Sequence, residues 1–165
     1  MWRLAACAIL LATTACQRLS EPVPPARTAI MLSASDPRAD SQLLNGFYPL
    51  FLDHRWTQGR FSARLMPPKD AARKGAVLVA VFGIADAAIQ NLHSIELTPT
   101  VEGVALPPER YTKAGDFTYA HDVPAGALTK EAVVVTFTLD KTLPPSGNEH
   151  RELGVNLSML GFEAK

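Results

Sequence analysis

The stretch VVVTFTL at residues 133–139 decides the fold class of this chain. Val133, Val135, Phe137 and Leu139 alternate with smaller or more polar residues. A period of two places all four side chains on the same face of a β-strand, because successive side chains point to opposite sides of a sheet. The stretch therefore predicts a strand with one face in an apolar core and the other face toward solvent.

Six other stretches have a strand pattern, and the segments between them are rich in proline, glycine, aspartate and serine, which favour turns. The other predicted strands are residues 28–33, 61–65, 77–82, 95–101, 117–123 and 153–159. Residues 77–82 are apolar on both faces, which predicts a central strand covered on both sides. Only residues 85–92 favour a helical turn. About seven strands with so little helix predict an all-β fold, an antiparallel β-sandwich of immunoglobulin-like or jelly-roll connectivity.

The first fifteen residues have the composition of an export signal. One positive charge, Arg3, precedes an apolar run at residues 4–12 that is too short to span a bilayer as a helix. Small residues then lead directly to Cys16, and this segment resembles the lipobox of bacterial lipoproteins, although Thr13 stands where that family most often has leucine. The resemblance implies a signal peptide at residues 1–15, cleavage before Cys16, and lipids on its thiol and new amino group. An ordinary secretory signal is the alternative.

The composition of the segment after the predicted lipid site indicates a spacer. Residues 16–27 contain three prolines among polar residues, a composition that favours an extended chain. We therefore expect a tether between the membrane and a domain at residues 28–165. Gln17, in place of aspartate, follows the cysteine, and among Gram-negative lipoproteins this favours the outer membrane, facing the periplasm.

Composition sets further bounds on the function. The chain has 165 residues, enough for one ordinary domain, and its 16 basic and 16 acidic residues cancel. No basic patch suggests a nucleic-acid partner. The only cysteines are Cys7 and Cys16, so we expect no disulfide and no thiolate metal site in the domain. The four histidines have no metal-ligand spacing, and we expect neither a metal nor a cofactor. His121 is expected to be a paired histidine in the core or at its rim.

Three short segments carry a resemblance to a known family. They are residues 45–49 (NGFYP), 55–57 (RWT) and 151–155 (RELGV). In this order they are similar to a recurrent bacterial β-sandwich domain found beside glycosyltransferases and in polysaccharide-related proteins. The resemblance spans about residues 28–162. It implies a sandwich of the carbohydrate-binding-module type and no active site.

The aromatic residues of these segments are the candidates for ligand binding. Phe47, Tyr48 and Trp56 offer ring faces on which a sugar could stack, and Arg55 could bond sugar hydroxyls. The alternative is that the rings close one end of the core, since a lone tryptophan in a sandwich is often a core residue. For Arg55 we expect an ion pair with Glu149 or Glu152.

These observations favour a non-catalytic binding module, anchored to the membrane through Cys16, with a glycan or an envelope protein as its partner. The first alternative is a structural or assembly subunit of a cell-envelope complex. A third hypothesis is an envelope hydrolase, for which Glu149 and Glu152 would be the pair of carboxylates that glycosidases need. Because no other catalytic cluster is present in the sequence, we predict that the chain is not an enzyme.

Overall fold

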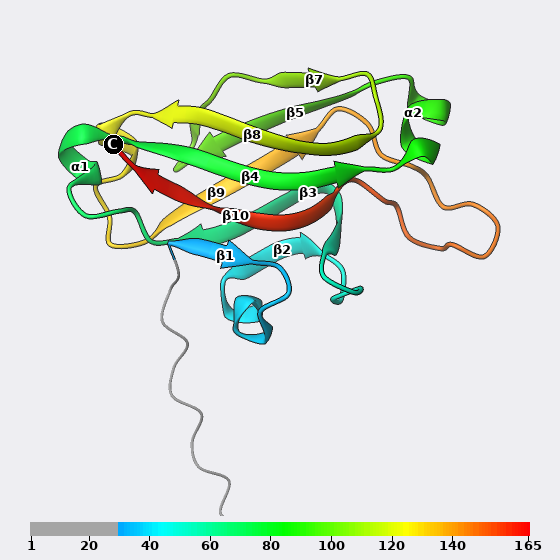
Figure 1. Cartoon of the computed structure of the whole chain (residues 1–165), viewed down its shortest axis with the longest axis horizontal. Helices are drawn as coiled ribbons and strands as arrows, with labels where there is room; N and C mark the ends of the chain where they lie inside the picture. The colour runs from blue at the N-terminus through cyan, green and yellow to red at the C-terminus, as the bar shows by residue number, and fades with distance from the viewer. Residues whose placement is uncertain (1–29) are drawn as a thin grey trace, which may run out of the picture.

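The computed structural model describes residues 30–165 as two packed antiparallel sheets (Figure 1). The predicted signal peptide, the lipid site Cys16 and the tether lie outside the described residues. Sheet A contains β1 (Met31–Ser33), β4 (Ala76–Ile84), β8 (Gly115–Val123) and β10 (Asn156–Ala164). Sheet B contains β2 (Leu43–Phe47), β3 (Arg55–Leu65), β5 (Ile95–Val101), β6 (Val104–Ala105), β7 (Glu109–Tyr111) and β9 (Val133–Leu139).

The two sheets are joined along one side. The strands follow the order β6-β5-β9-β3-β10-β4-β8, with β1 beside β10, β2 beside β3 and β7 beside β5. Between the sheets, β3 and β10 share the pairs Trp56 with Asn156 and Arg55 with Leu157. Every strand pair is antiparallel. The prediction of an all-β antiparallel sandwich is confirmed.

The number of strands differs from the prediction, since the described residues form ten and not seven. The three strands that were missed, β2, β6 and β7, are short or irregular. The pairing of β2 with β3 shifts register twice, and Gly46 in β2 has a φ of +79°. β6 has two residues and β7 has three. Periodicity needs a longer run to be visible, so such strands are lost in a sequence pattern.

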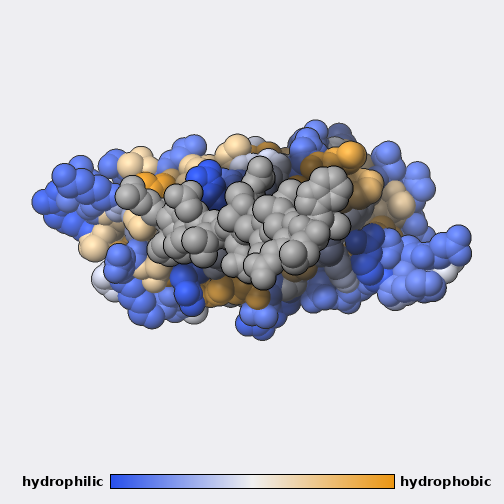
Figure 2. Space-filling model, turned by 90° about the horizontal axis from the view of Figure 1, so that it is seen from below, coloured by the Kyte–Doolittle hydropathy of each residue, from blue (hydrophilic) through white to orange (hydrophobic). Residues whose placement is uncertain are grey.

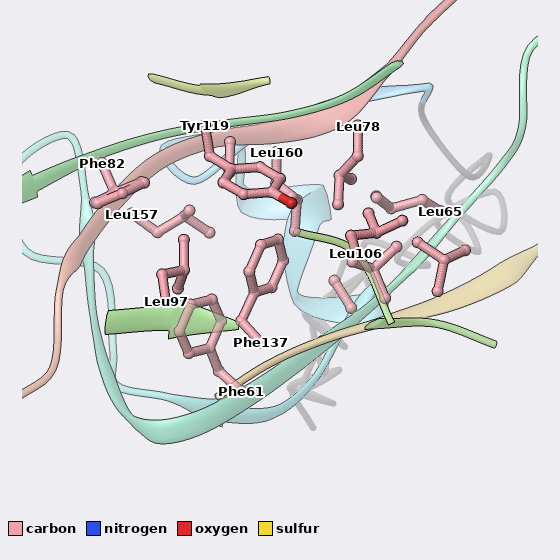
Figure 3. Close-up of a cluster of buried hydrophobic side chains, with 14 of the residues drawn as sticks. Phe61, Leu65, Leu78, Phe82, Leu97, Leu106, Tyr119, Phe137, Leu157 and Leu160 are labelled. Carbon is pink, nitrogen blue, oxygen red and sulfur yellow. The ribbon is translucent and has the colours of Figure 1, made fainter. Parts of the chain in front are cut away.

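The core lies between the inner faces of the two sheets (Figure 3). The four residues of β9 that define its period, Val133, Val135, Phe137 and Leu139, are all buried. The ring of Phe137 stacks on the ring of Phe61 from β3, with 5.0 Å between their centres and 11° between their planes. The predicted orientation of β9 is confirmed, because its apolar face points into the core between the two sheets.

The last strand departs from its predicted phase. Leu157 pairs with Phe82 and Met159 with Val81, so Ser158 is an extra residue that forms a β-bulge. A bulge moves every following side chain to the opposite face. Leu160 is consequently buried and Met159 is exposed. The strand predicted at residues 153–159 is present with other bounds, because β10 runs from Asn156 to Ala164, and the period of two does not continue through the bulge to Met159.

The remaining elements are short. β4 lies between β10 and β8 and is central as predicted, but its outer face is only partly covered, since Val77 and Val81 are half-buried. The predicted helical turn is confirmed as α2 (Asp86–Leu92). The other turns are α1 (Ala71–Lys74), η1 (Pro37–Ser41) and η2 (Ala125–Ala127). Among the described residues, no helix is long and apolar enough to cross a bilayer.

Candidate functional site

A groove lies beside η1, between the end of β2 and the start of β3, along the edge that Figure 1 shows at the bottom of the molecule. Its volume is about 480 Å³. Three of the four residues predicted to bind a ligand line it together: Phe47, Tyr48 and Arg55. The other lining residues are Pro37, Asp40, Pro49 and Leu50.

Arg55 forms the charged part of this groove. Its side chain is buried, and its Nη2 donates to Oδ1 of Asp40 at 2.6 Å while its Nε donates to the carbonyl oxygen of Ala34 at 3.1 Å. The predicted ion pair of Arg55 with Glu149 or Glu152 was wrong. The partner comes from η1, a single turn that begins after Asp36 and has proline at its first position. This turn holds Asp40 over Arg55.

Phe47 and Tyr48 have different neighbours, although both line the groove. The ring of Phe47 packs edge-on against Phe61 at 5.5 Å, which fixes it to the core. The hydroxyl of Tyr48 donates to the carbonyl oxygen of Glu152 at 2.9 Å, and the guanidinium of Arg151 lies 4.9 Å from the centre of its ring. One face of Tyr48 is therefore taken by Arg151, so Tyr48 also holds the loop before β10 against the sheet.

Trp56 does not line the groove. Side chains alternate along β3, so Trp56 lies on the face opposite to Arg55 and is half-buried there. It belongs to a row of rings on that outer face, in which His54 stands between Trp56 and Phe51. The ring centres are 6.4 Å and 5.6 Å apart. The structure thus separates Trp56 from the other three predicted residues.

The loop between β2 and β3 ends in three exposed apolar residues, Leu50, Phe51 and Leu52, which we call the apolar tip. Phe51 and His54 exchange two backbone hydrogen bonds across it, of 2.9 Å and 3.2 Å. Sequence reasoning missed the tip as a functional feature. A signal was present, because an apolar run between Pro49 and Asp53 joins two strands where a polar turn is usual.

The carboxylates of the hydrolase hypothesis are both engaged. Glu149 accepts from Nε and Nη2 of Arg151, at 2.8 Å and 2.7 Å, and from its backbone N–H. These hydrogen bonds to Arg151, the side-chain ones first, lower the pKa of Glu149 to about 2. A carboxylate that this pair holds ionised is a poor general acid at neutral pH. Glu152 accepts from the backbone N–H of Gly59 at 3.2 Å.

Two further observations concern charged clusters. His121 is half-buried, 2.6 Å from Oε1 of Glu109 through its Nε2, with its ring 4.6 Å from the ring of Tyr119. It is the paired rim histidine that the sequence predicts. Within residues 30–165, no group of three or more histidine, cysteine, aspartate or glutamate side chains could hold a metal ion.

A second depression lies on the outer face of sheet B, with a volume of about 380 Å³. It is lined mainly by polar side chains of β2, β3 and β9. The lining residues are Asn45, Gly46, Gln58, Arg60, Phe61, Ser62 and Thr136. It lacks an exposed ring, because Phe61 is buried.

No protein-family model and no curated protein matches the sequence. Several solved structures resemble the fold. One is a carbohydrate-binding module, CBM36, in complex with calcium and xylotriose, with a TM-score of 0.47 and 8% identity over 81% of this chain and 98% of that chain. Another is the CBM36-1 domain of a multidomain xylanase from the hindgut metagenome of Trinervitermes trinervoides, with a TM-score of 0.42 and 11% identity over 79% and 94% of the two chains.

A further structure is dimeric latent PorU from Porphyromonas gingivalis, with a TM-score of 0.41 and 6% identity over 87% of this chain and 13% of that chain. These likenesses concern the arrangement of strands. Similarity this distant carries neither a ligand nor an activity over to this chain.

Proposed function

We propose that this chain is a membrane-anchored, non-catalytic binding module of the bacterial cell envelope, and that the groove beside η1 binds a glycan. The observation that carries the proposal is the pairing, in one groove, of an apolar wall with an exposed carboxylate. Sugar rings present apolar C–H faces and hydroxyl groups together, so their sites combine aromatic side chains with a few fixed polar groups.

Asp40 is the polar group best placed to meet a ligand. Its side chain is 70% exposed although its Oδ1 is held by Arg55. Within residues 30–165, Arg55 bonds only Oδ1 of Asp40, and no group donates to Oδ2. A fixed carboxylate with one free oxygen is a strong acceptor for a sugar hydroxyl. Phe47, Pro37 and Leu50 provide the apolar contacts beside it.

The anchor part of the proposal rests on the sequence. Cys16 lies 14 residues before Ile30, the first described residue, and an extended chain of this length spans up to roughly 50 Å. The tether is thus long enough to let the domain reach the membrane surface in more than one orientation. Mass spectrometry of the mature protein tests this part. We expect an N-terminal Cys16 carrying acyl chains, and an unmodified Cys16 would refute it.

The glycan proposal is tested by binding measurements on the wild type and two variants. The probes are muropeptides, lipopolysaccharide core oligosaccharides and neutral β-linked oligosaccharides, followed by calorimetry. We expect one class to bind, and D40N to weaken it about tenfold, because a neutral amide replaces a charge-assisted acceptor. D53N is the matched control, since Asp53 is exposed and lies outside the groove. Binding that D40N leaves unchanged, or no binding to any probe, contradicts the groove assignment.

A second candidate function, an assembly subunit of an envelope complex, is favoured by the outer face of sheet A. Met159 is exposed there, and Met31, Val77 and Val81 are half-buried, so an apolar surface runs across β1, β10 and β4. Such a surface suits a protein partner. Crosslinking in cells from position 159, with the exposed position 138 on β9 of sheet B as control, distinguishes this function from glycan binding.

A further inference from the structure

The apolar tip holds three of the six exposed large hydrophobic residues in the described part of the chain. Leu50, Phe51 and Leu52 are 40%, 56% and 79% exposed. Single exposed hydrophobic residues are ordinary in proteins, but three large ones in succession at the end of a loop are not. We propose that this tip inserts into the lipid surface to which the chain is anchored, as a second membrane contact; this inference rests on the proposed anchoring at Cys16.

The tip is held in shape before any contact is made. Leu52 has a φ of +57°, a left-handed conformation that favours glycine or asparagine and is unfavourable for leucine. The two backbone hydrogen bonds between Phe51 and His54 close the loop, and the rings of these residues touch. The row of rings continues to Trp56 in β3. Glycine or asparagine would suit the left-handed backbone of residue 52 better than leucine does. The presence of leucine there is explained if its apolar side chain is needed for a contact.

The position of the tip agrees with a membrane contact. Figure 1 shows β1, β2 and the β2–β3 loop along the same lower edge of the molecule, and the described chain begins at this edge with Ile30, which is also exposed. Figure 2 looks onto this edge and shows hydrophobic atoms in separate places among hydrophilic ones. The predicted lipid site is 14 residues away. A tether that starts at this edge allows the tip to reach the same lipid surface.

The size of the tip favours lipid over a protein partner. Three side chains bury far less than the roughly 1,000 Å² that a specific protein interface needs. A membrane contact has no such minimum, because a weak insertion adds to an anchor that already exists. Asp53 follows the tip, is almost fully exposed and pairs with His54. A carboxylate at this position keeps the insertion shallow, at the level of the head groups.

The test uses the chain from residue 16 with C16S, which retains every described residue and cannot carry a lipid. Vesicles of phosphatidylethanolamine and phosphatidylglycerol (about 3:1) are the probe, and the bound fraction is measured by flotation. We expect weak binding that L52S and F51S each reduce at least fivefold, because both replace inserted apolar surface by a hydroxyl. V104S is the matched control, since Val104 is 41% exposed on β6, away from the tip.

A second readout locates the contact. Trp56 is the only tryptophan in the chain from residue 16 and lies near the tip through His54. We expect vesicles with lipids brominated near the head groups to quench its fluorescence, and L52S to abolish the quenching. No binding by the C16S chain, equal loss in V104S, or a change of oligomeric state on L52S would each overturn the insertion. A lipid found on Cys16 together with no vesicle binding refutes the tip and leaves the anchor intact.

Discussion

The interior of the sandwich and its lower edge differ in which types of side chain they bury and expose. Between the sheets, apolar side chains such as Phe61 and Phe137 are almost completely buried, and polar residues that alternate with them, such as Arg60 and Thr138, face outward. At the lower edge, the charged side chain of Arg55 is buried, whereas Leu52, three residues earlier, is one of the most exposed hydrophobic residues of residues 30–165. The two regions are in contact, since Phe47 at the groove packs on Phe61.

The difference separates residues that stabilise the fold from residues that serve binding. The interior follows the hydrophobic effect, and its pattern needs no other explanation. The edge buries a charge, which lowers stability unless a partner group compensates. It also exposes leucine and phenylalanine, whose side chains add little to the stability of the fold there. Asp40 compensates Arg55. The apolar tip stays exposed although Phe51 contacts His54, which is why we propose a contact outside this chain for it.

The largest effect is expected in the interior. F137A removes a ring that is completely buried and stacked on Phe61. Loss of a buried aromatic ring leaves a cavity, and we expect the free energy of unfolding to fall by about 3–5 kcal/mol, measured by urea denaturation. T138A, at the next and exposed position of β9, is the control and should change stability by less than about 0.5 kcal/mol. A cost of F137A below that of the edge variants would contradict the comparison.

The interior could be predicted from the sequence because the alternation of apolar and polar residues within a single strand is enough to indicate its buried face. In β3, β5, β8 and β9 a period of two gives both the strand and its buried face. The bulge at Ser158 broke the prediction for β10, since one extra residue reverses the phase and leaves no mark on composition. Short strands such as β6 are fixed by their neighbours in the sheet.

The edge could be predicted only in part. Phe47, Tyr48 and Arg55 were identified by residue type, and the structure places them in one groove. Trp56 follows Arg55 directly, and adjacent residues of a strand point to opposite faces, so the two could not share that groove. The partner of Arg55 could not be chosen among sixteen acidic residues. Asp40 meets it only because η1 folds back over β3, which is a long-range contact.

An intermediate effect is expected where the edge buries a charge. R55A removes the guanidinium that bonds Asp40 and the carbonyl oxygen of Ala34, and we expect a cost of about 2 kcal/mol in the free energy of unfolding. The loss of stability is smaller than for F137A because Asp40 is exposed, so water can replace the hydrogen bond that Arg55 donates to it. R55K keeps the charge without the planar fork and should lose about half as much. Equal stability of R55A and the wild type would show that the buried pair does not organise the groove.

The smallest effect on stability, with the opposite sign, is expected at the apolar tip. L52N removes an exposed side chain and places a residue that tolerates a φ of +57°, so we expect a gain of about 0.5 kcal/mol in the free energy of unfolding. V104N, also at an exposed position but outside the positive-φ residues, should bring no gain. Because the same L52N variant should lose vesicle binding, stability and membrane contact would change in opposite directions at one residue. Loss of both together would mean that Leu52 packs against this chain after all, and the contrast between interior and edge would not hold there.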